Sequence, residues 1–229
     1  TMIAKIKEIS IGSKYTYGKR RINKLLIDDG FNIGVYKTKA LMKVADIKVI
    51  IPKKKHYYAD SGVSHKYVGN LLNRDFNPTT ANTSWVGDIT YMPTSQGFYY
   101  LATVMDLHSR KIVGYSMSQS ATAELTKIAL DNAIRLTNAT TKDLMFHSDQ
   151  GCQYSANEFR SKLKLHNITQ SMSRKGNCWD NAVQERFYRS LKSEHLNHLT
   201  LRNYADAVIQ VEEYIQFYNY KRRHSAIGY

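Results

Sequence analysis

Apolar residues recur at helical spacing through the first part of the chain. Residues 3–10 form a helical segment, and a helix is predicted over about 18–29, with Ile22, Leu25 and Leu26 on its inner face and Gly30 ending it. A third helix is predicted over 34–47. Its inward face is expected to consist of Tyr36, Ala40, Leu41 and Val44.

The predicted helices over 18–29 and 34–47 are joined by a short glycine-containing turn. Such a pair resembles a helix-turn-helix, in which the second helix enters the DNA groove. In that case Lys37, Lys39 and Lys43 would point toward DNA. An ordinary helical hairpin explains the spacing equally well, so the pattern leaves both interpretations open.

The helical periodicity ends before residue 48, and an alternating pattern typical of β strands begins at residue 84. Residues 48–82 mix a lysine run with Gly, Pro and Asn, which indicates a basic linker. From Ser84 onward, apolar alternation and turn residues predict three strands at hairpin spacing, followed by alternating helices and short strands. The expected strands are 84–94, 97–107, 111–119, 143–149 and 168–173, and the expected helices are 121–137, 155–167, 181–196 and 203–220.

This order of elements predicts an α/β fold, a mixed five-stranded sheet with flanking helices, preceded by a small helical segment. The division we expect is a helical DNA-binding segment over 1–47, a basic linker over 48–82 and a catalytic core over 83–229. In a β-β-β-α-β order the fourth strand commonly lies beside the first, which matters for the acidic residues described below.

Charge adds a candidate partner to this picture. The chain of 229 residues has a formal net charge of +14, and residues 1–80 carry 16 Lys and Arg against 6 Asp and Glu. A concentrated positive charge favours a polyanion such as nucleic acid, although a solvated basic surface is the simpler alternative. No stretch has the roughly 18 apolar residues of a membrane helix, and no signal peptide opens the chain, so we expect a cytoplasmic protein.

Three acids are the candidate chemistry. Asp88 lies at the centre of the first strand, Asp149 ends the fourth, and Glu185 lies on the first turn of a later helix, with 35 residues (150–184) between the last two. Carboxylates that converge repel one another unless a cation binds them, and Mg²⁺ prefers such oxygen ligands. Two metal ions can hold the attacking and leaving oxygens of a phosphoryl transfer. Asp180 is the alternative to Glu185, but we expect it or Asn181 to cap the helix.

Four segments resemble a known family: WVGDIT, FHSDQGCQY, SRKGNCWDNAVQERFYRSLKSE and YNYKRRHSAIGY. They are similar to the catalytic subunit of frameshifted bacterial insertion-sequence transposases, which in turn resemble retroviral integrases. The resemblance implies an RNase H-like core in which Asp88, Asp149 and Glu185 bind metal. It also implies cleavage at the element ends and joining of the freed 3′-hydroxyl to target DNA.

The same resemblance implies the cofactors and partners. The expected cofactor is Mg²⁺, with Mn²⁺ as a substitute and two ions per site. The expected partner is double-stranded DNA, from the element's terminal inverted repeats and from the target. We also expect a homo-oligomer that assembles on this DNA at the bacterial nucleoid. The zinc-binding module of retroviral integrases has no counterpart, because His56 and His65 precede the core while both cysteines lie inside it at the wrong spacing.

Several basic residues near the acids are candidate DNA contacts. Lys192 lies nearly two helical turns after Glu185, about 10 Å along the same face, and Arg189 lies one turn after it. The full set of predicted contacts in and after the catalytic helix is Lys192, Arg189, Lys175, Arg174, Arg222 and Arg223. For each of them, an exposed or ion-paired structural role is the alternative. His147 is either a core residue or part of the site lining, and Trp179 is a weaker candidate for base stacking.

Two other functions share these features. A metal-dependent nuclease or resolvase of the same fold would use the acids without joining DNA ends. A non-catalytic DNA-binding regulator would need the helical hairpin but none of the three acids. A strand-transfer assay on pre-cut ends, combined with substitution of the acids, separates these alternatives.

Overall fold

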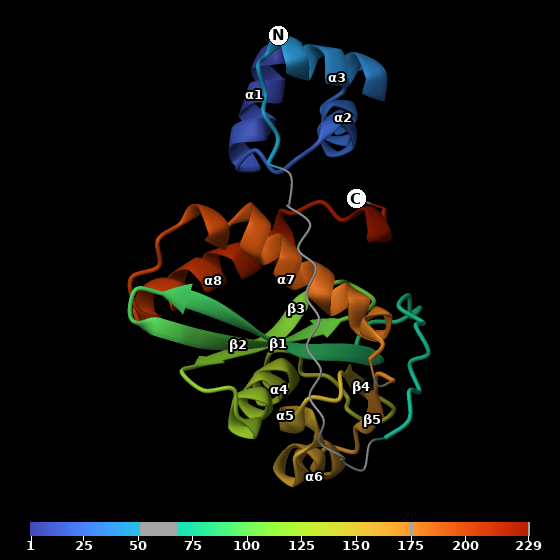
Figure 1. The fold of residues 1–229 in the computed structure, drawn as a ribbon. Coiled ribbons are helices and arrows are strands. Elements are labelled where there is room, and N and C mark those ends of the chain that lie inside the picture. The colour runs from blue at the N-terminus through green and yellow to red at the C-terminus, as the bar shows by residue number, and fades with distance from the viewer. Residues whose placement is uncertain (51–67, 175, 229) are drawn as a thin grey trace.

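The computed structural model describes residues 1–50, 68–174 and 176–228. Three helices come first, namely α1 (Met2–Gly12), α2 (Lys19–Asp28) and α3 (Val35–Val44), and an α/β core follows (Figure 1). Lys175, which we predicted to contact DNA, lies outside the described residues, as does the lysine run of the linker. Within the described ranges, no helix is long and apolar enough to cross a membrane.

The core is built on the predicted five-stranded mixed sheet. Its strands are β1 (Ser84–Thr94), β2 (Gly97–Asp106), β3 (Ile112–Ser118), β4 (Met145–Ser148) and β5 (Thr169–Met172). Their order in the sheet is β3-β2-β1-β4-β5. The strands β1, β2 and β3 pair antiparallel, while β4 runs parallel to both β1 and β5. The expected placement of the fourth strand beside the first is therefore confirmed.

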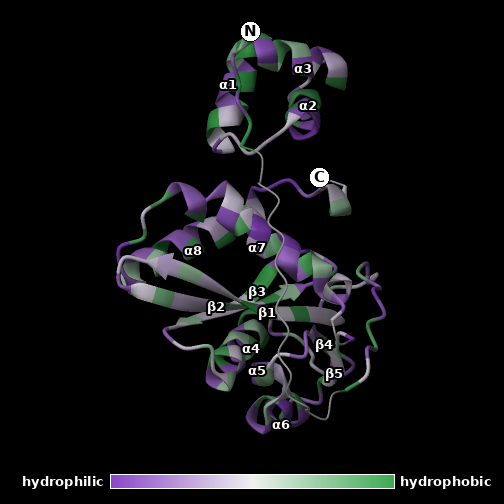
Figure 2. Cartoon of the chain, viewed as in Figure 1, coloured by the Kyte–Doolittle hydropathy of each residue, from purple (hydrophilic) through white to green (hydrophobic). Residues whose placement is uncertain are grey.

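Helices cover both faces of this sheet (Figure 1). On one face lie α4 (Ala123–Thr137), the short α5 (Cys152–Ser155) and α6 (Asn157–Leu165), and on the other lie α7 (Ala182–Glu194) and α8 (Tyr204–Tyr220). Short 3₁₀ turns precede and follow α7, at Cys178–Asn181 and Leu196–His198, and another forms Ser225–Ile227. The helices mix hydrophobic and hydrophilic positions, as amphipathic helices that cover a sheet do (Figure 2).

The two faces of the sheet bury separate hydrophobic clusters because side chains alternate along a strand. Val86 of β1 packs toward α7 and α8, together with Phe187 and Leu191. Its neighbour Trp85 packs on the opposite face, with α4 and α6. A Cβ atom at Gly87 would collide with the ring of Phe146 on β4, so glycine at this position lets β1 and β4 pack closely beside Asp88.

The three N-terminal helices enclose a small core of their own around Ile6, Ile22 and Leu26. The predicted inner face of α3 is wrong for Tyr36, which is 86% exposed, and for Val44, which is 71% exposed, whereas Leu41 does pack against this core. The buried positions of α3 are instead Thr38 and Met42. Thr38 is buried because its hydroxyl accepts a hydrogen bond from the Asn23 side chain (3.0 Å), and such a polar contact is not visible in a hydrophobic pattern.

Candidate active site

The sheet places two of the three candidate acids on adjacent parallel strands. The register between β1 and β4 pairs Val86 with His147. Continuing that register by two residues brings Asp149, just past the end of β4, opposite Asp88 in the middle of β1. Both carboxylates accept local backbone hydrogen bonds, Asp88 from Ile89 N (2.8 Å) and Asp149 from Gly151 N (3.0 Å).

The third acid is brought to these strands by α7, which is tied to the sheet by polar contacts. The hydroxyl of Tyr188 donates to the backbone carbonyl of Asp88 and accepts a hydrogen bond from Thr103 Oγ1 of β2 (2.8 Å). Near the start of the helix, the Asn181 amide donates to the carbonyl of Gly87 (3.2 Å). Since Glu185 lies between these two anchors, α7 holds it over the strand that carries Asp88.

The three carboxyl groups influence one another electrostatically. Burial raises the pKa of Asp88 well above its usual value, and the charges of Asp149 and Glu185 raise it further. Burial also raises the pKa of Asp149. The pKa of Glu185 is raised by burial and by the charge of Asp149. A group of acids whose ionisation is disfavoured in this way favours a bound cation.

The acids do not form a closed ligand cage as they stand. In the described part of the chain, no three His, Cys, Asp or Glu side chains are arranged to hold a metal ion. As whole residues Asp149 and Glu185 are exposed, although the surrounding protein partly desolvates their carboxyl groups, while Asp88 is half-buried. The oxygen donors and their mutual repulsion fit a hard divalent cation, but closure around it requires their side chains to move. That all three share one metal site stays a prediction.

Lys192 is the predicted basic residue nearest to this chemistry. Its charge lowers the pKa of Asp88, opposing the larger effects that raise it, and its Nζ lies 4.6 Å from the centre of the Tyr91 ring. Arg189, one turn after Glu185, is exposed on the same helix. Both positions are compatible with phosphate contacts, which remain predictions for these two residues.

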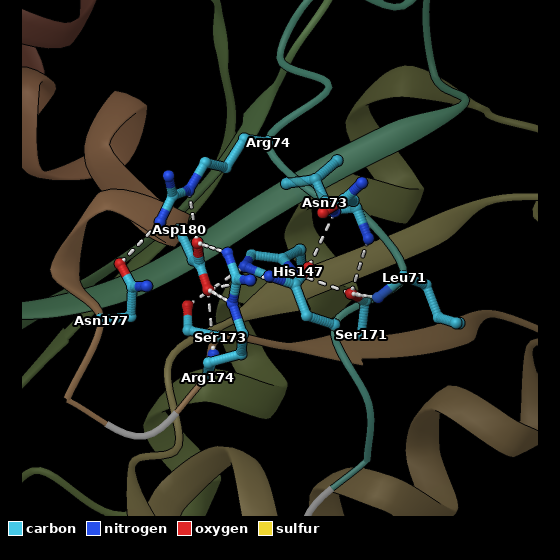
Figure 3. Close-up of polar contacts among 11 residues, drawn as sticks. Leu71, Asn73, Arg74, His147, Ser171, Ser173, Arg174, Asn177 and Asp180 are labelled. Atoms are coloured by element: carbon cyan, nitrogen blue, oxygen red, sulfur yellow. Dashed lines mark hydrogen bonds and ion pairs between the residues drawn. The ribbon is translucent and has the colours of Figure 1, made fainter.

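Asp180 does not cap α7 and is instead ion-paired with two arginines, so Asn181 is the one of the two expected caps that the structure confirms. The N-terminal cap of α7 is Asn181, which makes no side-chain capping bond, and Asp180 is fully buried in the preceding 3₁₀ turn. Its carboxylate instead binds the guanidinium groups of Arg174 and Arg74 (Figure 3). Hydrogen bonds from Arg174 make the largest contribution to holding the pKa of Asp180 below its usual value. Arg174, predicted to contact DNA, is thus ion-paired although its side chain is 55% exposed.

Two of the C-terminal basic residues, Arg222 and Arg223, form ion pairs with acids of the protein. Arg222 is buried and makes two hydrogen bonds to Glu194 (2.8 and 2.7 Å). This contradicts the predicted DNA contact of Arg222, because a phosphate could reach its guanidinium only by displacing a buried carboxylate. Arg223 pairs with Asp28 of α2 (3.2 Å) and is partly exposed, so its DNA contact stays a prediction.

The remaining candidates divide between surface and core. Lys37, Lys39 and Lys43 are all exposed on α3, as a DNA-reading helix requires. His147 is fully buried and bonds the hydroxyls of Ser171 (2.8 Å) and Ser173 (3.2 Å), so it belongs to the core rather than to the site lining. Burial lowers its pKa to about 4. Trp179 is 69% exposed, and base stacking by it stays a prediction.

Sequence reasoning missed two groups that support the site. Tyr188 follows Glu185 by three residues, so helical spacing alone could have placed it on the same side of α7. Arg74 gave no such signal, because it lies in a segment without periodicity and meets Asp180 across 106 residues of sequence.

Comparison with known proteins identifies the domains of this chain. Two family models, each described as an integrase core domain, match residues 78–178 and 166–229, and a model described as an HTH-like domain matches residues 2–55. The fold also resembles the HTLV-2 integrase catalytic core domain in complex with magnesium (dimeric form), with a TM-score of 0.51 and 21% identity over 64% of this chain and 92% of that one. The fold and its domains thus define an integrase-like, DNA-binding polynucleotidyl transferase.

Sequence relatives narrow this class to a family. The transposase for insertion sequence element IS904 of Lactococcus lactis is 37% identical over 98% of this chain and 89% of its own length. The insertion element IS600 uncharacterized 31 kDa protein of Shigella sonnei is 38% identical over 97% of this chain and 82% of its own length. The chain belongs to the insertion-sequence transposases, whose general activity is DNA cleavage and strand transfer.

Proposed function

We propose that Asp88, Asp149 and Glu185 form the metal-binding site that carries out DNA cleavage and strand transfer in this chain. The observation that carries the proposal is that the charges of Asp149 and Glu185 raise the pKa of Asp88 and the charge of Asp149 raises that of Glu185, so the three carboxyl groups lie within electrostatic reach. Parallel pairing of β1 with β4 and the anchoring of α7 to β1 explain why acids so far apart in sequence lie within electrostatic reach.

Mg²⁺ is the expected ion, with Mn²⁺ as a substitute and two ions per site, and the integrase core that shares this fold was solved with magnesium. When bound, the metal stabilises charge on the attacking and leaving oxygens of the phosphodiester. The protein's part is to supply the oxygen ligands on rigid elements. Asp88 is fixed within the sheet, Asp149 follows the end of β4, and Glu185 is on the first turn of α7.

The reaction needs no covalent link to the protein. Water first attacks the phosphodiester at an element end and releases a 3′-hydroxyl. That hydroxyl then attacks a target phosphodiester, forming one P–O bond while another breaks, and the target's own 3′-oxygen leaves and takes up a proton. We expect Lys192, whose charge lowers the pKa of Asp88, to bind a phosphate oxygen during these steps.

Substrate binding extends beyond the catalytic site. The exposed lysines of α3 and the exposed Arg189 are proposed to contact the terminal inverted repeats or the target DNA. Insertion requires two element ends to be held together, so we propose that a homo-oligomer forms on the DNA. The substrate places the enzyme at the nucleoid of the bacterial cytoplasm.

A strand-transfer assay on pre-cut element ends with Mg²⁺ tests the proposal. Asp88→Asn, Asp149→Asn and Glu185→Gln should each lower joining by at least about 100-fold, since loss of a metal ligand removes charge stabilisation of the transition state. Asp143→Asn is the matched control, because Asp143 is exposed, lies six residues before Asp149, and has a φ of 70° that asparagine adopts readily.

The outcomes of this assay also separate the alternative functions. Loss of joining in the three variants, with DNA binding retained, supports the proposal. Hydrolysis without any joined product would instead identify a nuclease. Full joining by any of the three variants would remove that acid from the proposed site.

A further inference from the structure

Near the proposed metal site, the buried Asp180 accepts hydrogen bonds from three residues in two segments of the chain. Asp180 accepts from Arg174 through the backbone N (3.1 Å), Nε (3.0 Å) and Nη2 (3.0 Å). It also accepts from Arg74 Nε (2.7 Å) and Asn70 Nδ2 (2.9 Å). Figure 3 shows the two guanidinium groups meeting at this one carboxylate. Such charge-assisted bonds are among the strongest available to a side chain.

Two of these partners come from the chain that leads into the core. There, the backbone N–H groups of Leu71 and Leu72 both donate to Ser171 Oγ of β5 (2.9 and 3.1 Å). Because that oxygen accepts two hydrogen bonds, its own proton is directed to His147 Nδ1, 2.8 Å away. Leu72 is 2% exposed and belongs to the main core. The segment around Arg74 is therefore fixed to the sheet and can act as a support.

The remaining partner of Asp180 is Arg174, which lies in the loop that leads to α7. Arg74 Nη2 donates to Asn177 Oδ1 (3.0 Å), so one guanidinium bridges the loop and Asp180 (Figure 3). Gly176 in this loop has a φ of +69°, a conformation that other L-residues rarely adopt. Asp180 lies two residues before α7, and Glu185 follows five residues after it. A shift of the Asp180 turn would therefore shift Glu185.

We propose that Asp180 is a positioning residue for Glu185, acting as a clamp between Arg74 of the entering segment and Arg174 of the loop. The inference rests on the proposed function, in which Glu185 binds metal. Without the carboxylate, two guanidinium groups that now share one oxygen of Asp180 would repel each other and separate. The turn before α7 would lose its fixed support, and Glu185 would reach the metal less often.

A purely stabilising ion pair would behave differently from a clamp. It would lower overall stability and leave the metal dependence of the remaining folded protein unchanged. A clamp changes the placement of Glu185, so it alters the concentration of metal needed for activity and the local motion of the turn. Trp179, which is 69% exposed and directly precedes Asp180, reports that motion through its fluorescence anisotropy.

The test compares Asp180→Asn with Asp206→Asn in the full chain. Asp206 is a close match, because it accepts the same three groups of one arginine, Arg202 N (3.2 Å), Nε (2.8 Å) and Nη2 (3.2 Å), at the exposed start of α8. Three quantities are measured for each variant: Mn²⁺ binding by calorimetry, the Mn²⁺ midpoint of strand transfer, and the fluorescence anisotropy of Trp179. The contribution of the fully buried Trp85 is obtained from Trp179→Phe and subtracted.

We expect Asp180→Asn to weaken Mn²⁺ binding and raise its midpoint by about tenfold, the size seen when groups that orient metal ligands are removed. The kcat should fall while the KM for DNA changes less than about threefold. Trp179 anisotropy should also fall. The control Asp206→Asn should leave Mn²⁺ binding, the Mn²⁺ midpoint and Trp179 anisotropy unchanged. Unaltered Mn²⁺ binding and anisotropy in Asp180→Asn would overturn the clamp.

A milder variant keeps the test informative if Asp180→Asn folds poorly. Arg74→Gln removes a 43% exposed partner and leaves Asp180 paired with Arg174. This variant should weaken Mn²⁺ binding and raise the Mn²⁺ midpoint of strand transfer by about threefold, and it should also lower Trp179 anisotropy. Unchanged values of these quantities would count against the clamp. Failure of the proposed function is recognised separately, because Glu185→Gln would then keep full strand transfer whatever the Asp180 variants do.

Discussion

Replacing Tyr188 by phenylalanine removes a single hydroxyl that joins the helix of Glu185 to the strand of Asp88. That hydroxyl donates to the Asp88 carbonyl and accepts from Thr103 Oγ1 (2.8 Å). It also lies 3.2 Å from the Leu101 carbonyl. The side chain is only 6% exposed, so water cannot easily replace these contacts.

The expected cost follows from this burial. A buried polar group left without its partner costs about 1–3 kcal/mol, so we expect Tyr188→Phe to lower the free energy of unfolding by that amount. Strand transfer should fall by about tenfold, because the backbone at Asp88 and the helix of Glu185 lose their shared anchor.

Tyr204→Phe is the matched control. The Tyr204 hydroxyl also donates to a strand carbonyl, that of Met117 (3.1 Å), but the side chain is 42% exposed and lies at the β3 edge of the sheet. Water can take its place, so the change in unfolding free energy should stay within about 0.5 kcal/mol and activity should be retained. Urea unfolding and a strand-transfer time course measure both effects. Equal effects of the two variants would refute the anchoring role of Tyr188.

Two further predictions concern the ion pair between Glu194 and Arg222 and the exposed lysines of α3. Burial raises the pKa of Glu194, but its hydrogen bonds to Arg222 help to keep that pKa below the ordinary value of 4.5. The ionised Glu194 therefore stabilises the fold above pH 4.5, and this stabilisation is lost as the pH falls through the lower pKa of the folded state. Urea unfolding between pH 7 and 3 should show this loss in the parent and not in Glu194→Gln, and parallel curves would contradict it. Substituting Lys37, Lys39 and Lys43 by glutamine should weaken DNA binding and reduce the salt slope by about 0.9 for each phosphate group that the protein no longer neutralises. An unchanged slope would exclude α3 from the DNA interface.

The strand order and the positions of the acids could be predicted because local signals carried them. Alternation placed Asp88 inside a strand, and an apolar run ended at Asp149. Parallel pairing of β1 with β4 then follows from general topology, and the structure confirms it. Helical periodicity also found α7, whose first turn carries Glu185.

The roles of several charged and polar residues could not be predicted in the same way, because each depends on a partner distant in sequence. Arg222 looked like a phosphate ligand until the fold placed Glu194 against it. Asp180 looked like a helix cap, but Arg174 and Arg74 bind its oxygens. Thr38 was not among the positions predicted to face inward, although the Asn23 side chain donates a hydrogen bond to its hydroxyl among the three N-terminal helices. A hydrophobic pattern contains no information about such pairings.

The most direct measurement for the whole account is an anomalous difference map from crystals soaked in Mn²⁺. Because the charges of Asp149 and Glu185 raise the pKa of Asp88 although the three carboxyl groups do not enclose a metal ion, we predict that side-chain movement brings Asp88, Asp149 and Glu185 onto one or two Mn²⁺ peaks, at about 2.0–2.2 Å from the nearest oxygens, typical of a small divalent ion. A map without a peak among these three residues, or with Mn²⁺ bound by other ligands, would contradict the proposed catalytic site.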